Sequence, residues 1–116
     1  SDLKMAIFHL NRMRKLYKKK LERLTSVLAP YTPAVTVSGE QAGMHIVLTV
    51  QTRLSEKELL GLAKQEKIRV FGLESYDISG RTLTPPKIVL GFGGLSEAEI
   101  EQGILKLMRC WGIDPL

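Results

Sequence analysis

The sequence predicts an α+β fold, in which a long N-terminal helix precedes a three- to four-stranded mixed or antiparallel sheet with helices on one face. Three observations support this prediction. Residues 2–28 contain no proline or glycine and repeat apolar residues every three or four positions. Two later segments carry the same helix-start motif. Two short runs of strand character precede each of these segments.

The N-terminal helix is the longest predicted element. Its apolar stripe consists of Leu3, Ala6, Leu10, Met13, Tyr17, Leu21, Leu24 and Leu28. A residue before proline is disfavoured in the helical region, so the helix is expected to end at Ala29-Pro30. With a rise of 1.5 Å per residue it would be about 40 Å long, whereas a compact domain of this size is only about 30 Å across. We therefore expect the helix to extend beyond its own domain.

The first third of this helix is apolar on more than one side. Met5 and Phe8 point away from the stripe, and nearly every residue between Leu3 and Leu10 is apolar. A helix that is apolar all round is normally buried all round. We therefore predict that Met5 and Phe8 form an interface with protein outside this chain, either a missing upstream domain or a second copy. A local fold-back over Phe8 is the alternative.

The remaining elements follow from strand and capping signals. The predicted strands are Val35–Val37, Met44–Gln51, Ile68–Phe71 and Ile88–Phe92. The first two are expected to form a hairpin around the loop Ser38–Gly43, and the last two are separated by a long loop with its turn at Ser79-Gly80-Arg81. Ser55 with Glu58, and Ser96 with Glu99, have the spacing of a capping box. They predict one helix that runs to about Gln65 and a second that buries Ile100, Ile104, Leu107, Met108 and Trp111.

Composition narrows the class of protein. The 116 residues suit one domain, with residues 1–29 as a long interdomain helix and residues 34–116 as an α/β layer. Apolar residues make up 44% and charged residues 25%, which excludes a disordered or collagen-like chain. No apolar run approaches the ~20 residues that span a bilayer. The single cysteine excludes an internal disulfide framework and favours the cytoplasm. The net charge of +5 permits an anionic partner without requiring one.

Candidate catalytic chemistry is sparse. His9 and His45 have no companion ligands at metal-site spacing, and Cys110 lacks an activating base nearby in the sequence. The segment Gly91–Gly94 before Ser96 resembles a strand-to-helix turn more than a phosphate-binding loop, because it lacks the GxGxxG spacing. The basic run Arg12–Arg23 wraps around the helix, so a solvated face is favoured over nucleic-acid binding. We predict no catalytic residue and no metal site.

Motifs along nearly the whole chain resemble one family. Phe8–Lys20 is similar to the "H-I-R-R-M-R-x-x-Y-x-x-R" helix of MocR-type (GabR-like) regulators of the GntR superfamily. Gly43–Val47 resembles their "G-x-H" strand start, and Glu58–Val70 their "A-x-x-x-G-V-x-V" helix and strand. Leu90–Leu107 is similar to their closing "R-L-G-F-A…I-x-x-G-I-x-x-L".

This resemblance implies a larger protein. MocR-type regulators join an N-terminal winged helix-turn-helix to a fold-type-I aminotransferase-like domain that binds pyridoxal 5′-phosphate. The chain would be the C-terminal small subdomain of that second part, with an aminotransferase small-domain-like fold. The Schiff-base lysine and the other cofactor residues of the family lie upstream of it, so this fragment is expected to bind no cofactor. The intact protein is expected to be a cytoplasmic homodimer that contacts DNA only through the absent winged helix-turn-helix.

One functional residue of the family falls within the fragment. It is the arginine before "L-G-F", which grips an α-carboxylate, and its position here is Val89. Lys87, two residues away on the same strand face, and Arg81 in the preceding loop are the candidates to replace it. A solvated surface charge is the alternative for each. Three classes stay open: a regulator's effector-domain fragment, the small domain of an active aminotransferase, and a free-standing basic binding module.

Overall fold

A four-stranded antiparallel sheet forms the centre of the structure. The computed structural model describes residues 1–41, 44–64, 67–73 and 85–116. The strands are β1 (Val35–Gln41), β2 (His45–Val50), β3 (Arg69–Gly72) and β4 (Lys87–Gly91), and they lie in the order β1-β2-β4-β3. Each neighbouring pair is antiparallel, so the predicted α+β class is confirmed and the sheet is antiparallel rather than mixed.

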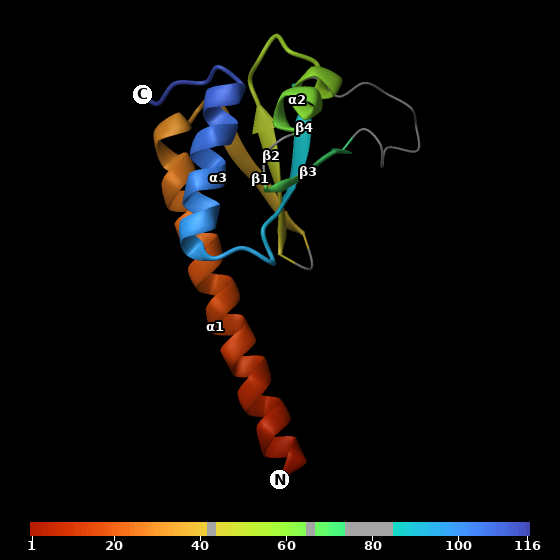
Figure 1. Cartoon of the computed structure of the whole chain (residues 1–116), viewed down its shortest axis with the longest axis vertical. Helices are drawn as coiled ribbons and strands as arrows, with labels where there is room; N and C mark the ends of the chain where they lie inside the picture. The colour runs from red at the N-terminus through yellow and green to blue at the C-terminus, as the bar shows by residue number, and fades with distance from the viewer. Residues whose placement is uncertain (42–43, 65–66, 74–84) are drawn as a thin grey trace.

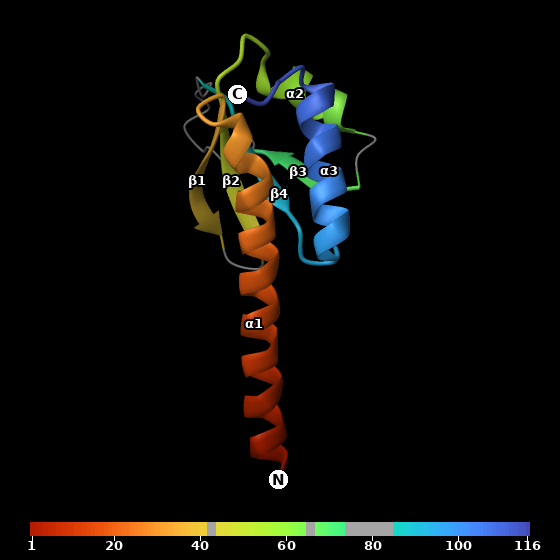
Figure 2. The same cartoon turned by 90° about the vertical axis from the view of Figure 1, so that its left-hand side faces the viewer.

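Three α-helices surround one face of this sheet. They are α1 (Asp2–Leu28), α2 (Glu56–Ala63) and α3 (Glu97–Cys110), and a 3-10 turn, η1 (Ala29–Tyr31), follows α1. The C-terminal half of α1 and the whole of α3 lie side by side over the sheet, while α2 packs next to β3 (Figures 1 and 2). The element order agrees with the sequence prediction. As expected, α1 ends at Leu28, two residues before Pro30.

The hydrophobic core lies between the sheet and the helices. The sheet contributes Ile46, Leu48, Val50, Ile88 and Leu90, and the helices contribute Leu24, Leu28, Leu59, Ile100, Ile104, Leu107 and Met108. Trp111 closes the end of this core, and its indole Nε1 donates a hydrogen bond of 3.0 Å to the carbonyl of Leu59. This bond joins the end of α3 to α2 and leaves no buried indole donor unsatisfied.

Both predicted capping boxes are present. Ser55 Oγ accepts from Glu58 N at 3.1 Å, and Glu58 Oε1 accepts from Ser55 N at the same distance. Ser96 and Glu99 form the equivalent pair at 3.1 and 3.0 Å. These reciprocal bonds satisfy orphan donors at the starts of α2 and α3.

Two sequence predictions about the elements need correction. The segment Ser38–Gly43 is not a six-residue loop, because β1 continues to Gln41 through a register shift between Val37 and Gly39. The extra residue at that shift lets pairing with β2 resume beyond it. The predicted helix end at Gln65 and the predicted turn at Ser79-Gly80-Arg81 lie outside the described residues.

The N-terminal half of α1 extends past the sheet and α3 into solvent (Figures 1 and 2). The molecule measures 55 × 34 × 24 Å for this reason. Only the part of the apolar stripe from Tyr17 onward packs against the core. Leu3, Leu10 and Met13 are 71%, 55% and 44% exposed, so the first half of the stripe lies outside the core, and the helix extends beyond its own domain as expected. No described part of the sheet or of α3 reaches that far along the helix axis.

We predict cooperative thermal unfolding without any added cofactor, because the core is contributed by all three helices and the sheet. Leu107→Ala removes a fully buried side chain and should lower the free energy of unfolding by about 2–5 kcal/mol. Leu105→Ala, on the solvent side of the same helix, should change it by about 0.5 kcal/mol or less. Urea denaturation of both variants measures this difference. Equal effects would contradict the assigned core.

The capping box of α3 predicts a pH dependence of stability. The pKa of Glu99 lies below its ordinary value. The largest cause is the hydrogen bond from the Ser96 backbone, and the next is a hydrogen bond with the Ser96 side chain. A lowered folded-state pKa contributes stability above the unfolded pKa of about 4.3, and this contribution is lost as the pH falls through the lower folded value. Glu99→Gln keeps the cap but abolishes the titration, so its stability should decline less than that of the wild type below about pH 4.3. Chemical denaturation at several pH values tests this, with Glu97→Gln from the same helical turn as the control.

Candidate functional site

The face of the sheet opposite the helices, called here the outer face, carries three cross-strand rows. Directly paired residues in an antiparallel sheet share a face, so the pairing register defines the rows. The first row is His45–Gly91–Arg69, the second is Val47–Val89–Phe71 and the third is Thr49–Lys87. Basic groups therefore lie at both ends of an apolar centre.

Gly91 makes the first row compact. A Cβ atom at this position would lie 3.0 Å from His45 Nε2, 3.1 Å from His45 Cδ2 and 3.8 Å from Arg69 Cβ. The imidazole of His45 thus lies across the glycine, in the space that a side chain would fill. This arrangement brings an imidazole from β2 and an arginine from β3 to the two sides of a single β4 residue.

A cleft of about 160 Å³ opens beside this row. It is lined by His45, Lys67, Arg69, Gly91, Gly93, Gly94 and Leu95. Among the described residues, its lining includes three basic side chains and no carboxylate, and it also includes part of the turn between β4 and α3. Glu99 lies near Lys67, since both side chains line a hollow at the start of α3.

Interactions from distant segments hold the turn between β4 and α3 in place. Lys20 of α1 is 8% exposed, and its Nζ donates a hydrogen bond of 3.0 Å to the carbonyl of Gly93. Phe92 N donates to the carbonyl of Met44 at 3.0 Å, and the Tyr17 and Phe92 rings stack with centroids 6.0 Å apart. The preference for a fully solvated basic run is therefore wrong at Lys20, which the fold uses to tie α1 to the turn.

The second row places Val89 at the centre of the outer face. Val89 is 9% exposed and Val47 is 5% exposed, although neither belongs to the core between sheet and helices. Lys87 lies on the same face, and its Nζ donates a hydrogen bond of 2.9 Å to Thr49 Oγ1. Arg81, the second candidate to replace the family's arginine, lies outside the described residues.

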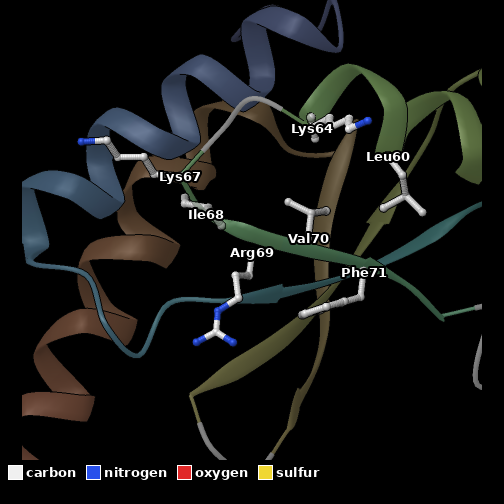
Figure 3. A pocket seen from close by; sticks show the side chains of 8 residues that line it. Leu60, Lys64, Lys67, Ile68, Arg69, Val70 and Phe71 are labelled. Atoms are coloured by element: carbon white, nitrogen blue, oxygen red, sulfur yellow. The ribbon is translucent and has the colours of Figure 1, made fainter.

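A second hollow lies between α2 and the edge strand β3 (Figure 3). It measures about 340 Å³ and is lined by Leu60, Ala63, Lys64, Lys67, Ile68, Arg69, Val70 and Phe71. Val70 points toward Leu60, whereas Arg69 and Phe71 extend from the other side of β3 (Figure 3). Arg69 and Lys67 therefore line both this hollow and the cleft at Gly91.

The other sequence candidates lie apart from the cleft. Met5 and Phe8 are 69% and 64% exposed on the projecting half of α1, where His9 is exposed too. The Cys110 thiol donates to the carbonyl of Leu107 at 3.2 Å. Among the residues that the structure describes, no group of three or more histidine, cysteine or acidic side chains could hold a metal ion. Within the same ranges, no helix has the length and apolar content needed to cross a membrane.

The basic cleft was not predicted from the sequence. His45, Lys67 and Arg69 are separated along the chain and carry no shared motif. The register of β2, β4 and β3 brings His45 and Arg69 together, and Lys67 joins them from the segment just before β3. The glycine before Phe92 was the available signal, because a glycine inside a strand marks a close approach of neighbouring groups.

The sequence is similar to two longer proteins of known class. It is 39% identical over 110 residues to YdeL, an uncharacterised HTH-type transcriptional regulator of Bacillus subtilis (strain 168). It is 35% identical over 107 residues to YhdI, a second such regulator of the same strain. The matches include 90% and 89% of this chain but only 22% of each regulator. The chain is homologous to a segment of HTH-type transcriptional regulators. It spans about a fifth of their length, and no protein-family model matches it.

The fold is aminotransferase-like. Kynurenine aminotransferase from Pyrococcus horikoshii, solved in complex with PMP, matches 96% of this chain with 27% of its own chain, at a TM-score of 0.77 and 22% identity. LysN, the α-aminoadipate aminotransferase of Thermus thermophilus, matches 89% of this chain with 26% of its own, at a TM-score of 0.74 and 21% identity. The homologues and the fold agree with the suspected origin in an aminotransferase-like part of a regulator.

Proposed function

We propose that this chain is the C-terminal small subdomain of the aminotransferase-like effector domain in a MocR-type, pyridoxal-phosphate-dependent regulator. One combination of observations carries the proposal: the homologues are HTH-type regulators, and the fold is one that occurs within aminotransferases. The chain would contribute one wall of an effector site and part of the contact with a large domain. DNA binding would belong to a separate winged helix-turn-helix, and the intact protein would act in the cytoplasm as a homodimer.

We propose that the described residues form no pyridoxal-phosphate pocket by themselves. A Schiff-base lysine must place its amine in a sheltered cavity at the cofactor. Lys20 is the buried lysine of the described ranges, and its Nζ already donates to Gly93 in the packing between α1 and the turn. We therefore propose that the cofactor belongs to the intact protein and that this fragment has no catalytic activity.

The small domain of an active aminotransferase is the second candidate function, favoured by the structural similarity to two such enzymes. The residue at position 89 argues against it. Transamination requires the substrate amine to be held over the cofactor, and a carboxylate clamp supplies much of that positioning. The valine side chain offers no hydrogen-bond donor, and one of the three donors of Lys87 Nζ is directed to Thr49 Oγ1.

The reading frame that encodes this chain distinguishes the two candidates. A winged helix-turn-helix followed by an aminotransferase-like large domain upstream of Ser1 would support the regulator. The intact product should then bind an operator fragment and show the absorbance band of an internal aldimine. A large domain without a DNA-binding region, together with measurable transamination, would overturn the proposal in favour of the enzyme.

The projecting half of α1 supports a contact with a large domain in the intact protein. Leu3, Met5, Ile7, Phe8, Leu10, Met13 and Leu16 are all large, apolar and between 44% and 71% exposed. Exposed apolar patches of this kind mark interaction sites. Because both sides of the helix are uncovered, we propose that a large domain encloses it in the intact protein and that a second copy does so in the isolated chain.

Phe8→Asp should make the isolated chain monomeric without unfolding it. Burial of a phenylalanine contributes roughly 1.5–3 kcal/mol, which corresponds to about one to two orders of magnitude in a dimer dissociation constant. Sedimentation velocity at several concentrations measures the association, and circular dichroism verifies the fold. Leu62→Asp, at an exposed apolar residue of α2, is the matched control and should leave the association unchanged. A wild type that is monomeric at all concentrations would contradict the interface.

Pyridoxal phosphate should form no specific adduct with the isolated chain. We expect weak imines distributed over exposed lysines, since no lysine of the described ranges combines burial with an available amine. Dialysis followed by borohydride reduction and peptide mapping distinguishes the alternatives. A single lysine labelled at one equivalent would refute this expectation.

A further inference from the structure

We propose that the cleft beside the His45–Gly91–Arg69 row is a binding site for a small oxyanion, a carboxylate or a phosphate group. Three basic side chains from β2, β3 and the segment before β3 line it, and no acidic side chain of the described ranges does. A shared anionic ligand would offset the positive charges of Lys67 and Arg69. The inference concerns this chain alone and does not depend on the proposed regulator.

Arg69 is the principal ligand-binding group of the cleft. It is exposed, and among the described residues no ion pair or hydrogen bond engages its guanidinium. A guanidinium presents a planar fork of donors that matches the two oxygens of a carboxylate or a phosphate. Its position on β3 directs it to the outer face, away from Val70 and the core (Figure 3).

The glycines of the cleft provide room for the ligand. The His45 imidazole covers Gly91, so an anion would enter the cleft beside this ring, along the turn at Gly93 and Gly94. A Cβ atom at Gly94 would meet no other group within 4 Å, which means that the turn opens directly to solvent. The Lys20 bond to Gly93 holds this turn in place before a ligand arrives, and preorganisation of this kind reduces the cost of binding.

The size of the cleft sets the class of ligand. Its volume of about 160 Å³ is smaller than the ~300–1,000 Å³ of typical sites for whole organic ligands. It therefore suits one anionic group, with the rest of any larger molecule outside. The site lies one row away from Val89 on the outer face.

Titration of the ¹⁵N-labelled chain with inorganic phosphate and, separately, with succinate tests the proposal. Both titrations are made at constant ionic strength in chloride. We expect saturable shifts of the Gly91, Gly93 and Gly94 amide signals with at least one of the two anions. Saturation by phosphate alone assigns the site to phosphate groups, saturation by succinate alone assigns it to carboxylates, and saturation by both assigns it to oxyanions in general.

Arg69→Gln should weaken this binding about tenfold, the effect of losing one charge-assisted bidentate contact. Arg53→Gln removes the same charge from an exposed arginine outside the cleft and should leave the affinity unchanged. Gly91→Ala places a methyl group against the His45 ring and should weaken binding as well. Circular dichroism establishes that each variant is folded, and Lys67→Gln replaces any variant that is not.

Two results would overturn the proposal. Shifts that grow linearly with both anions, without saturation, would indicate general screening rather than a site. Equal losses in Arg69→Gln and Arg53→Gln would indicate a response to net charge. Neither result would bear on the regulator proposal, which depends on the upstream reading frame.

Discussion

The packing of helices on one face of a small sheet is the constraint on which the structure depends. β2 and β4 direct Ile46, Leu48, Ile88 and Leu90 toward the helices, where α3 and the second half of α1 remove them from water. Because the helices cover only that face, the opposite face is left for rows of mixed polarity. The same constraint explains the exposed start of α1, since the sheet is too short to support the whole helix.

Much of this arrangement could be predicted from local sequence signals. Ser55 and Ser96 fix the starts of α2 and α3 because each has a glutamate three residues later, and Pro30 fixes the end of α1. Signals of this kind act within one helical turn and are independent of the tertiary fold. The burial of the apolar stripe, by contrast, depends on which other elements of the fold lie beside the helix. Leu10 and Met13 have the same periodicity as Leu24 and Leu28, but no described element lies beside them.

The candidate site was beyond sequence reasoning for a related reason. Cross-strand neighbours depend on the register, and a shift by one residue would move Arg69 to the core face. The strand order β1-β2-β4-β3 also places β3, rather than β1, beside β4. Neither property is encoded in a short motif. The resemblance to a regulator family identified position 89 as important, and the structure adds the groups that surround it: Val47 and Phe71 in its own row, with Arg69 and Lys87 in the rows on either side.

The continuity of α1 has a geometric consequence. Residues 2–28 form one helix without a proline or a glycine, so its projecting and packed halves share a single axis. Lys20 fixes the rotation of that axis relative to the turn that follows β4, and Arg23 adds an ion pair to Glu101 of α3 at 3.1 Å. A domain that binds the first half of α1 would consequently fix the orientation of the outer face of the sheet relative to itself.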